Sequence, residues 1–361
     1  MTRLAEGLTA RGHELQVFTT SLTALDAAGS TRSRVETVGG VSVHYLATPV
    51  HFRWMGLTPT LPLQLERAPR PDIVHVFGFR DPIGTGVAAW CRVRNVPYVF
   101  EGLGMVAPKH RKVLLKRALD STAYRGVMRG ATLLVAASAV EAREYLAAGI
   151  PEQRIVVRPH GFPEVLRDRE PGKLRERVAV EDETPVVLNV GRIAHGKGLE
   201  LLVHLTTQLP GVHVAIVGPD GGHGVENELL ALRDRLSLRD RVHFVGPLPR
   251  SELPSVYADA DVFVLPSSYE NFGMVAAEAA AAGAPILVTD RCGVAECFAG
   301  RGALVVPYGE AELRSALLRL LNDAELRRRL GEEAREVAAE WSWPRVLELQ
   351  EDVYGRALAD A

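Results

Sequence analysis

The segment that decides the fold spans residues 261–283 and reads DVFVLPSSYENFGMVAAEAAAAG. Four apolar residues near its start predict a short buried strand over 261–265. A polar loop follows, and the small residues after it predict a helix over 273–282 that Gly283 ends. Asn271 is of a type that often caps the start of a helix. The segment is therefore one strand–loop–helix unit.

The same alternation of strand and helix runs along the rest of the chain. A polar stretch over 164–184 divides it into two series. Strands that alternate with helices of about 10–15 residues are typical of parallel sheets with right-handed crossovers. The length of 361 residues also favours two domains. We therefore predict an α/β fold with two doubly wound domains, over 1–163 and 164–342, and a helix over 343–361 that packs back on the first domain.

Composition and charge argue against several classes of protein. The formal net charge of −2 does not favour binding to nucleic acid. The three cysteines lack a framework spacing, which indicates free thiols in a reducing compartment. The first residues form no signal-peptide-like apolar region, and no stretch of 18 apolar residues occurs. We therefore expect a cytoplasmic protein, or at most one bound peripherally at the inner face of the cell membrane.

One loop suited to binding an anion follows the strand predicted over 185–190. It carries Gly191, Arg192 and Lys197, and a helix follows it. Glycines let the backbone approach a ligand closely, and the two cations can meet one anion. A helix N-terminus beside two cations suits a diphosphate, although the spacing is not that of a Walker A loop. An ordinary turn with surface charges is the alternative.

A second loop of this kind lies inside the segment quoted first. Glu278 stands among alanines in the predicted helix, where an unpartnered buried carboxylate would be costly. It is either exposed or bonded to a polar group such as paired sugar hydroxyls. Glu270 precedes the helix, whose first amides offer an anion site at 272–274. These pieces suit a nucleoside diphosphate sugar; the alternative is that Glu270 only favours the helix dipole and Glu278 is solvated.

These residues together resemble a known family. The pattern consists of Pro266-Ser267, then Glu270 and Glu278 with seven residues between them, and upstream Gly191-Arg192 and Lys197-Gly198. It resembles the retaining family 4 glycosyltransferases of the GT-B fold, also called glycosyl transferases group 1. Weaker signals, such as Arg11-Gly12-His13-Glu14 and Val217-Gly218, extend the resemblance over nearly the whole chain. It implies two Rossmann-like domains that face a central cleft.

The resemblance also implies a role for each position. Arg192 and Lys197 would neutralise the donor diphosphate in place of a metal ion, so neither a cofactor nor an obligatory metal is expected. Glu278 would bind ribose hydroxyls, and Glu270 the hydroxyls of the donor sugar. Transfer would retain the anomeric configuration, with a leaving phosphate oxygen helping to take up the acceptor proton. The expected catalytic residues are thus Arg192, Lys197 and Glu270; the expected donor contacts are Gly191, Asn271, Phe272, Gly273 and Met274, with Phe244 and Val245 beside the base.

We therefore expect a glycosyltransferase that moves a hexose from a nucleoside diphosphate sugar to a glycan or lipid-linked acceptor, as in polysaccharide biosynthesis. Two alternatives stay open: a sugar-nucleotide epimerase of the same fold, and a non-catalytic sugar-nucleotide-binding partner subunit. An epimerase would turn over donor without any acceptor. A phosphorylase of related architecture would need a lysine site for pyridoxal phosphate, which the sequence does not show.

The chain departs from the family pattern at its start and on the acceptor side. Relatives open with a strand and a glycine-rich loop before the helix predicted here over 2–10, so a segment of about 15–25 residues is expected to be missing. Where many relatives carry His-Gly, this chain has Glu101, which either contacts the acceptor or caps the next turn. His160 is expected to be a hinge residue rather than a catalyst. Glu101 and His160 are the two candidate acceptor-side residues.

A basic amphipathic helix is predicted over 109–129. Lysines and arginines accompany apolar residues in it, a composition that suits an anionic membrane surface. In relatives that glycosylate lipids, such a helix lies near the acceptor. Peripheral membrane contact through 109–129 is therefore one expectation, and a solvated helix face is the other.

Overall fold

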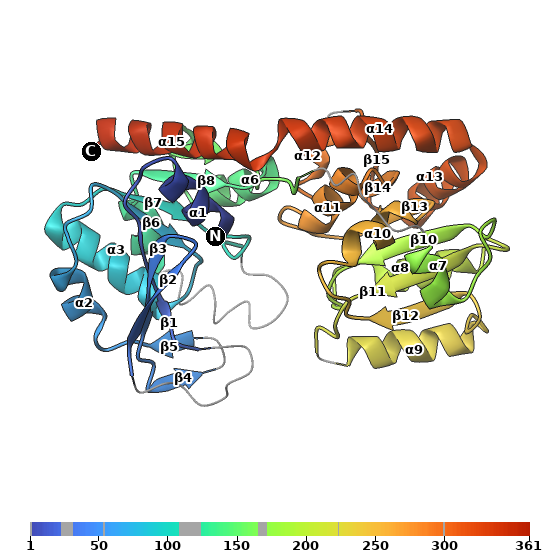
Figure 1. Cartoon of the computed structure of the whole chain (residues 1–361), viewed down its shortest axis with the longest axis horizontal. Helices are drawn as coiled ribbons and strands as arrows, with labels where there is room; N and C mark the ends of the chain where they lie inside the picture. Colours follow the sequence, from blue (N-terminus) through green and yellow to red (C-terminus); the bar gives the residue numbers. More distant parts are fainter. Residues whose placement is uncertain are drawn as a thin grey trace. The chain divides into compact units, whose positions relative to one another are not determined.

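The chain forms two compact units in a computed structural model (Figure 1). The first unit comprises Met1–Arg158 together with Trp343–Ala361, and the second unit comprises Pro159–Ser342. The structure describes residues 2–22, 32–52, 55–107, 124–164, 172–222, 224–298 and 300–361. The C-terminal helix therefore belongs to the same unit as the N-terminal part of the chain.

A six-stranded sheet forms the centre of the second unit, and all neighbouring strands in it run parallel. Its inner strands are continuous apolar runs such as VFVL, because both faces of a parallel sheet are covered. The spatial order is β12-β11-β10-β13-β14-β15. The strands are β10 (Val186–Val190), β11 (His213–Val217), β12 (Val242–Gly246), β13 (Val262–Leu265), β14 (Ile286–Thr289) and β15 (Ala303–Val306).

The helices of the second unit bury their apolar stripes against this sheet. Leu202 of α8, Leu229 of α9 and Leu317 of α13 belong to one buried cluster with valines of the strands. The alanine-rich helix α11 packs closely on α10 and α14. The helices are α7 (Lys173–Val178), α8 (Leu199–Thr206), α9 (Val225–Arg235), α10 (Leu253–Ala258), α11 (Met274–Ala282), α12 (Ala295–Phe298), α13 (Glu310–Asn322) and α14 (Ala324–Glu340).

The strand order of the second unit reverses between β10 and β13. From β10 the chain proceeds to β11 and β12, and it then returns to β13 on the other side of β10. In a parallel sheet, the loops that follow β10 and β13 leave from the same edge. Ligands of open α/β sheets bind outside the carboxyl ends of the strands at such a switch point.

Among the described residues, the first unit contains three sheets. Strands β6-β7-β8-β9 run parallel, whereas β1-β3-β2 includes an antiparallel pair and β4-β5 is a small hairpin. Gly39 and Gly40 form the turn between β2 and β3 with φ of 57° and 81°, as a tight hairpin requires. Among the described residues, β1 and β6 each lie at the edge of their sheet. The strand expected ahead of residue 2 stays a prediction.

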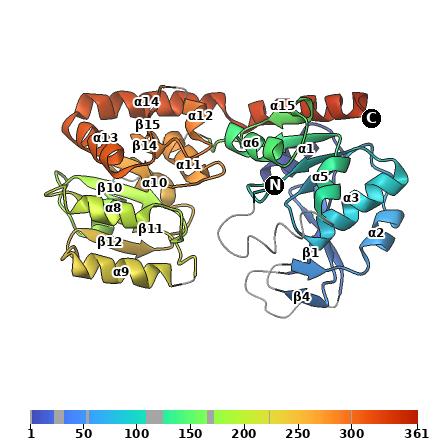
Figure 2. The ribbon, with the colours of Figure 1, turned by 180° about the vertical axis from the view of Figure 1, so that it is seen from behind.

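The C-terminal helix α15 lies along the first unit. Leu347 forms a buried cluster with Leu4 and Leu8 of α1, and Val353 packs with residues of β7 and β8. Figures 1 and 2 show α1 and α15 side by side. The elements of this unit are α1 (Thr2–Ala10), β1 (Gln16–Thr20), β2 (Arg34–Val38), β3 (Val41–Leu46), β4 (Val50–Phe52), β5 (Met55–Leu57), α2 (Leu61–Arg67), β6 (Val74–Phe77), α3 (Pro82–Arg94), β7 (Tyr98–Glu101), α5 (Arg125–Gly130), β8 (Leu133–Ala136), α6 (Ala139–Ala147), β9 (Ile155–Val157) and α15 (Trp343–Ala359).

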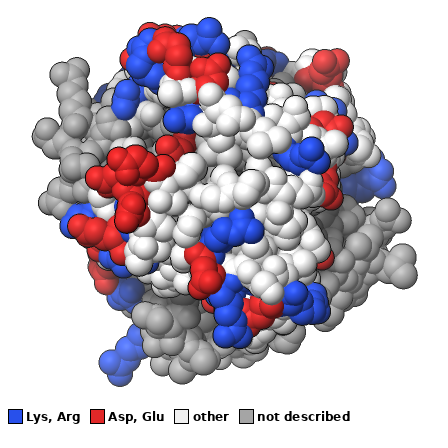
Figure 3. Space-filling model, turned by 90° about the vertical axis from the view of Figure 1, so that its right-hand side faces the viewer, with Lys and Arg blue, Asp and Glu red and all other residues white. Residues whose placement is uncertain are grey.

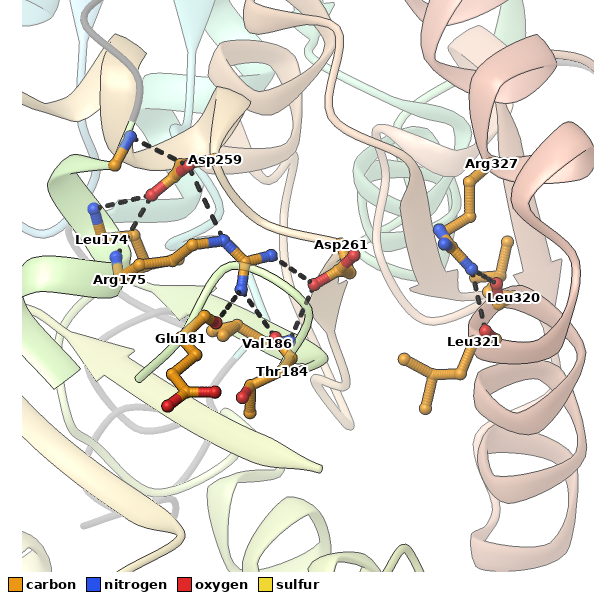
Figure 4. Close-up of polar contacts among 11 residues, drawn as sticks. Leu174, Arg175, Glu181, Thr184, Val186, Asp259, Asp261, Leu320, Leu321 and Arg327 are labelled. Atoms are coloured by element: carbon orange, nitrogen blue, oxygen red, sulfur yellow. Dashed lines mark hydrogen bonds and ion pairs between the residues drawn. The ribbon is translucent and has the colours of Figure 1, made fainter. Parts of the chain in front are cut away.

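The polar stretch over 164–184 contains a helix that the sequence did not predict, α7. Figure 4 shows why it forms: the Asp259 carboxylate accepts hydrogen bonds from the Leu174 and Arg175 amides at 3.0 and 3.1 Å, which caps the helix from outside. The Arg175 guanidinium bonds Asp261 at 2.9 Å. A short polar helix is thus stabilised by carboxylates about 85 residues further along, a relation no local pattern reveals.

Charge is mixed on the side of the molecule drawn in Figure 3. Basic and acidic side chains surround an area of uncharged residues on that face. The described residues of this face therefore carry both signs of charge.

Candidate functional site

The loops that leave β10 and β11 touch each other at the switch-point edge of the second unit. The Gly191 amide donates to the Val217 carbonyl at 2.8 Å. Gly218 has φ of 145°, and a Cβ atom there would lie 1.9 Å from the Gly191 carbonyl oxygen. Only glycine permits that approach, so the backbone around Gly191 is fixed by its neighbour loop.

The loops that leave β10 and β13 are equally close. A Cβ atom on Gly198 would lie 1.8 Å from the Pro266 carbonyl oxygen, and Gly198 has φ of 71°. The Ser268 amide donates to the Gly196 carbonyl at 2.9 Å. The two candidate loops of the sequence analysis therefore form one surface.

An ion pair joins these loops across the switch point. The Lys197 ammonium bonds the Glu270 carboxylate, and the two side chains are 24% and 19% exposed. Backbone hydrogen bonds of 3.0 Å to Arg291 and Gly293 hold Glu270 itself. Arg192 is exposed in the same loop and has no ion-pair partner among the described residues. A basic group and an acidic group are thus presented together at the carboxyl edge of the sheet.

Glu278 lies on α11 and is half-buried. The Tyr257 hydroxyl on α10 donates to its Oε2 atom at 2.8 Å. Burial, together with the nearby Glu278 charge, raises the pKa of Tyr257 well above its ordinary value, so the phenol stays a donor. Tyr257 was not among the residues predicted from the sequence, because a tyrosine within a short helix carries no local signal of such a role.

The start of α11 differs from the sequence prediction. The helix begins at Met274, and its N-cap is Gly273 with φ of 105° rather than Asn271. Phe272 is 3% exposed, and its ring packs edge-on against His160 at 5.1 Å between centroids. The Phe272 side chain is therefore part of the core, and only its backbone is suited to a donor contact. His160 lies directly beside this loop.

The segment predicted to lie beside the base is at the end of β12. Phe244 packs against the buried cluster under α9, and the Arg233 guanidinium lies 5.9 Å from its ring centroid. The ring is therefore turned into the helix layer. Val245 is half-buried, and Gly246, with φ of 78°, carries the backbone over the carboxyl edge. A base contact at Phe244 and Val245 stays a prediction, and for Phe244 it would involve the backbone.

The geometry favours a structural role for Glu101, the candidate acceptor residue. Glu101 ends β7, is 1% exposed, and forms an ion pair with the Arg158 guanidinium, which is 2% exposed. His75 Nε2 lies 3.5 Å from its carboxylate, and His75 Nδ1 bonds the Tyr354 hydroxyl at 2.9 Å. Burial lowers the pKa of His75 despite the adjacent carboxylate. These contacts tie α15 to the parallel sheet of the first unit, and acceptor contact by Glu101 stays a prediction without support here.

A cavity of about 640 Å³ adjoins the loop after β10. It lies between α8 and α9 and includes His195, Gly196 and Ser268, but neither Glu270 nor Glu278 lines it. The cavity is therefore not the site defined by the charged residues of the two loops, since Arg192 and Lys197 do not line it either.

Several sequence predictions fall on parts that the structure does not describe. Residues 109–123 of the basic helix expected over 109–129 lie outside the described residues, so membrane contact stays a prediction. Within the described ranges, no helix is both long and apolar enough to cross a bilayer. The described residues also hold no group of three or more His, Cys, Asp or Glu placed to bind a metal ion.

The second unit defines the class of protein. Its strands, numbered along the chain, follow the order 3-2-1-4-5-6, and its polar residues gather at the switch point of that sheet. This is the arrangement of nucleotide-binding α/β proteins.

The family follows from comparison with known sequences. The pattern of the family described as glycosyl transferases group 1 matches residues 172–337, and that of the glycosyl transferase 4-like domain matches residues 1–161. The chain belongs to the group 1, family 4-like glycosyltransferases. It is 31% identical to the D-inositol 3-phosphate glycosyltransferase of Mycobacteroides abscessus, over 81% of this chain and 69% of that protein. It is 24% identical to an uncharacterized glycosyltransferase of Methanocaldococcus jannaschii, over 98% of this chain and 93% of the other.

Solved structures show the same fold. Sucrose-phosphate synthase from Thermosynechococcus elongatus matches with a TM-score of 0.76 at 23% identity, over 99% of this chain and 92% of that one. HepE from Anabaena, solved in complex with UDP and glucose, matches with a TM-score of 0.77 at 20% identity, over 98% and 94%. The chain therefore has the GT-B fold. Its membership of the glycosyltransferase family, shown by the sequence comparisons, makes it a transferase enzyme.

Proposed function

We propose that this enzyme is a retaining glycosyltransferase that binds a nucleoside diphosphate sugar at the switch point of the second unit and transfers its hexose to a glycan or lipid-linked acceptor. The observation that carries the proposal is the ion pair between Lys197 and Glu270, with Arg192 in the same loop. A diphosphate needs cations at this edge, and a sugar needs a hydrogen-bond acceptor beside them.

Each charged residue has a part in the proposal. Arg192 and Lys197 neutralise the diphosphate and stabilise the charge that develops as it leaves. Glu270 accepts hydrogen bonds from the hydroxyls of the donor sugar, and Glu278 from those of the ribose. A phosphate oxygen of the leaving group takes the proton of the attacking acceptor hydroxyl. The protein supplies position and charge, with no nucleophile of its own and no obligatory metal.

The relatives suggest which substrates to test first. HepE is described with UDP and glucose, and several curated relatives are named D-inositol 3-phosphate glycosyltransferases. We therefore start from UDP-hexoses as donors and from inositol phosphate, simple glycans and lipid-linked sugars as acceptors. GDP- and ADP-hexoses complete the donor set, because backbone contacts at the end of β12 do not reveal the base.

The test is a turnover assay that separates transfer from other uses of the donor. Nucleoside diphosphate release is measured with and without acceptor, in the presence of a chelator, and the anomeric configuration of the product is read by proton NMR. We expect acceptor-dependent release and a product with the configuration of the donor. Donor conversion to an epimer without acceptor, or a product of inverted configuration, would contradict the proposal.

A further inference from the structure

Tyr257 is a buried phenol that the fold holds in one place. The residue is 1% exposed on α10, next to the fully buried Val256. Its ring packs edge-on against Phe263 of β13, with 5.5 Å between centroids and an interplanar angle of 69°. Helix α10 in turn packs against α11. The position of the Tyr257 hydroxyl is therefore set by the core of the second unit.

The Tyr257 hydroxyl forms a hydrogen bond with the Glu278 carboxylate. It donates to Glu278 Oε2 at 2.8 Å, and among the described residues this is the only hydrogen bond formed by the Glu278 side chain. Oε1 of the same carboxylate has no partner in the described part of the chain. One oxygen is thus fixed to the protein, and the other is available to a ligand.

The neighbours of Glu278 on its own helix cannot hold its carboxylate in one orientation. Alanines flank it on α11, and they carry neither donors nor bulk to restrict a glutamate side chain. A glutamate without such restraint loses rotamer freedom when it binds a ligand, which weakens binding. A bond to the rigid phenol removes much of that freedom in advance.

The type of donor also matters. Glu270 is paired with the Lys197 cation, which shares its charge. Glu278 is held by a neutral hydroxyl, so its negative charge stays available to a ligand. A carboxylate with its full charge is the stronger acceptor for the two adjacent hydroxyls of a ribose.

We propose that Tyr257 is a positioning residue that orients the Glu278 carboxylate so that Oε1 receives the ribose hydroxyls of the nucleotide donor. This inference rests on the proposed function, which places the ribose at Glu278. Tyr257 lies 21 positions before Glu278, on a different helix. It would act on the nucleotide only through Glu278.

The experiment compares binding of UDP and 2′,3′-dideoxy-UDP to the full chain by calorimetry, with GDP and its dideoxy analogue if guanine is the preferred base. Tyr257→Phe keeps the ring and removes the hydroxyl. We expect Tyr257→Phe to weaken UDP binding about tenfold and to change dideoxy-UDP binding less than about twofold. The reason is that only UDP carries the ribose hydroxyls that would bind Glu278. A merely structural role for Tyr257 would weaken both ligands equally.

Tyr98→Phe is the matched control. Tyr98 is also 1% exposed, and its hydroxyl donates to the Val127 carbonyl at 2.6 Å in the first unit. Its variant shares the loss of a buried hydroxyl, but we expect the ratio of the two affinities to stay at the wild-type value. This comparison separates a general loss of stability from a loss of ribose recognition.

Glu278→Ala separates the positioning role of Tyr257 from the assignment of the ribose to Glu278. If it removes the preference for UDP over dideoxy-UDP while Tyr257→Phe keeps the wild-type preference, the positioning role is wrong and the ribose site stands. If Glu278→Ala keeps the preference, the ribose assignment itself fails. If Tyr257→Phe does not fold, the conservative replacement of Tyr257 by 3-fluorotyrosine, which retains the hydroxyl, must keep the wild-type preference; loss of preference there would overturn the inference.

Discussion

Lys197 and Glu270, which are 73 residues apart in the sequence, form an ion pair across the switch point of the second unit. Both side chains keep some exposure, so the pair contributes little net stability and serves mainly to place two charges. We infer that a bound diphosphate takes over the Lys197 ammonium. Glu270 is then released to the hydroxyls of the sugar.

Replacing Lys197 tests that exchange. We expect Lys197→Ala to lower kcat/KM for the donor by about 10–100-fold, the effect of losing one charge-assisted hydrogen bond in the transition state. The melting temperature should change little, because the ion pair is partly exposed. Steady-state kinetics and a thermal melt measure both quantities. Arg345→Ala, which removes a surface cation of the first unit, is the control, and equal kinetics in the two variants would refute the diphosphate role.

Two glycines offer a matched test of the contact between the loops. Gly198 and Gly224 both cap helices with left-handed backbone, at φ of 71° and 79°. A Cβ atom on Gly198 would collide with the Pro266 carbonyl, whereas no atom of the described residues lies within 4 Å of one on Gly224. We expect Gly198→Ala to lower the free energy of unfolding by about 1–3 kcal/mol more than Gly224→Ala. Denaturant titration of both variants measures the difference, and equal losses would show that the loops can separate freely.

A stacked histidine pair at the other end of the sheet predicts a dependence on pH. His213 Nδ1 lies 3.0 Å from His243 Nε2 on the neighbouring strand. Burial is the main cause that lowers the pKa of both imidazoles, Arg241 adds to it for His213, and Asp240 opposes it. Because the folded-state pKa values lie below the ordinary value of about 6.5, the unfolded state binds more protons below that pH. Stability conferred by the neutral pair is therefore complete above about pH 6.5 and is lost as the pH falls toward the lowered values.

The pH prediction is checked by denaturant midpoints at about pH 7.5 and 5. The variant His213→Gln/His243→Gln should lose less stability between these values than the wild type does. Some dependence should persist, because burial also lowers the pKa of His75 in the first unit. Identical pH profiles for the two proteins would mean that the histidine pair does not contribute.

Replacing Glu101, which forms the buried ion pair with Arg158, tests whether Glu101 has a structural role or binds the acceptor. Glu101→Gln removes the negative charge that pairs with the buried Arg158 guanidinium, so we expect the free energy of unfolding to fall by about 3–5 kcal/mol. The exposed pair of Glu66 and Arg94 provides the control, since Glu66→Gln should alter stability little. If Glu101→Gln folds with wild-type stability and instead raises KM for the acceptor, Glu101 is an acceptor residue after all.

Much of the second unit could be predicted from the sequence, because its strands are apolar runs and its helices have clear ends. The strand expected over 261–265 is Val262–Leu265, and the helix expected over 273–282 is Met274–Ala282. The short edge strand β15 and the helix α7 were missed. Four or six residues give no usable periodicity, and α7 depends on a cap from Asp259, far along the chain.

The candidate site was predictable as a set of residues but not as a set of contacts. Loops at the carboxyl ends of strands identified Lys197 and Glu270. Glu278 was identified as a single carboxylate among the alanines of the predicted helix. The partners of these residues depend on strand order and on helix packing, which place Tyr257 beside Glu278. Glu101 stood in a similar loop position, yet the pairing of strands turned it toward Arg158 and into the core. Long-range packing therefore decides which loop residues face a ligand.

The central claim is that the switch point of the second unit binds a nucleoside diphosphate through its charged residues. Calorimetric titration of the wild-type chain and of Glu278→Ala with UDP, GDP, ADP and their hexose conjugates tests it most directly. The account predicts selective binding of one nucleotide in the range of about 1–100 μM, weakened at least about tenfold in a variant that keeps its fold. Binding of none of the nucleotides, or equal binding by the wild type and the variant, would contradict it.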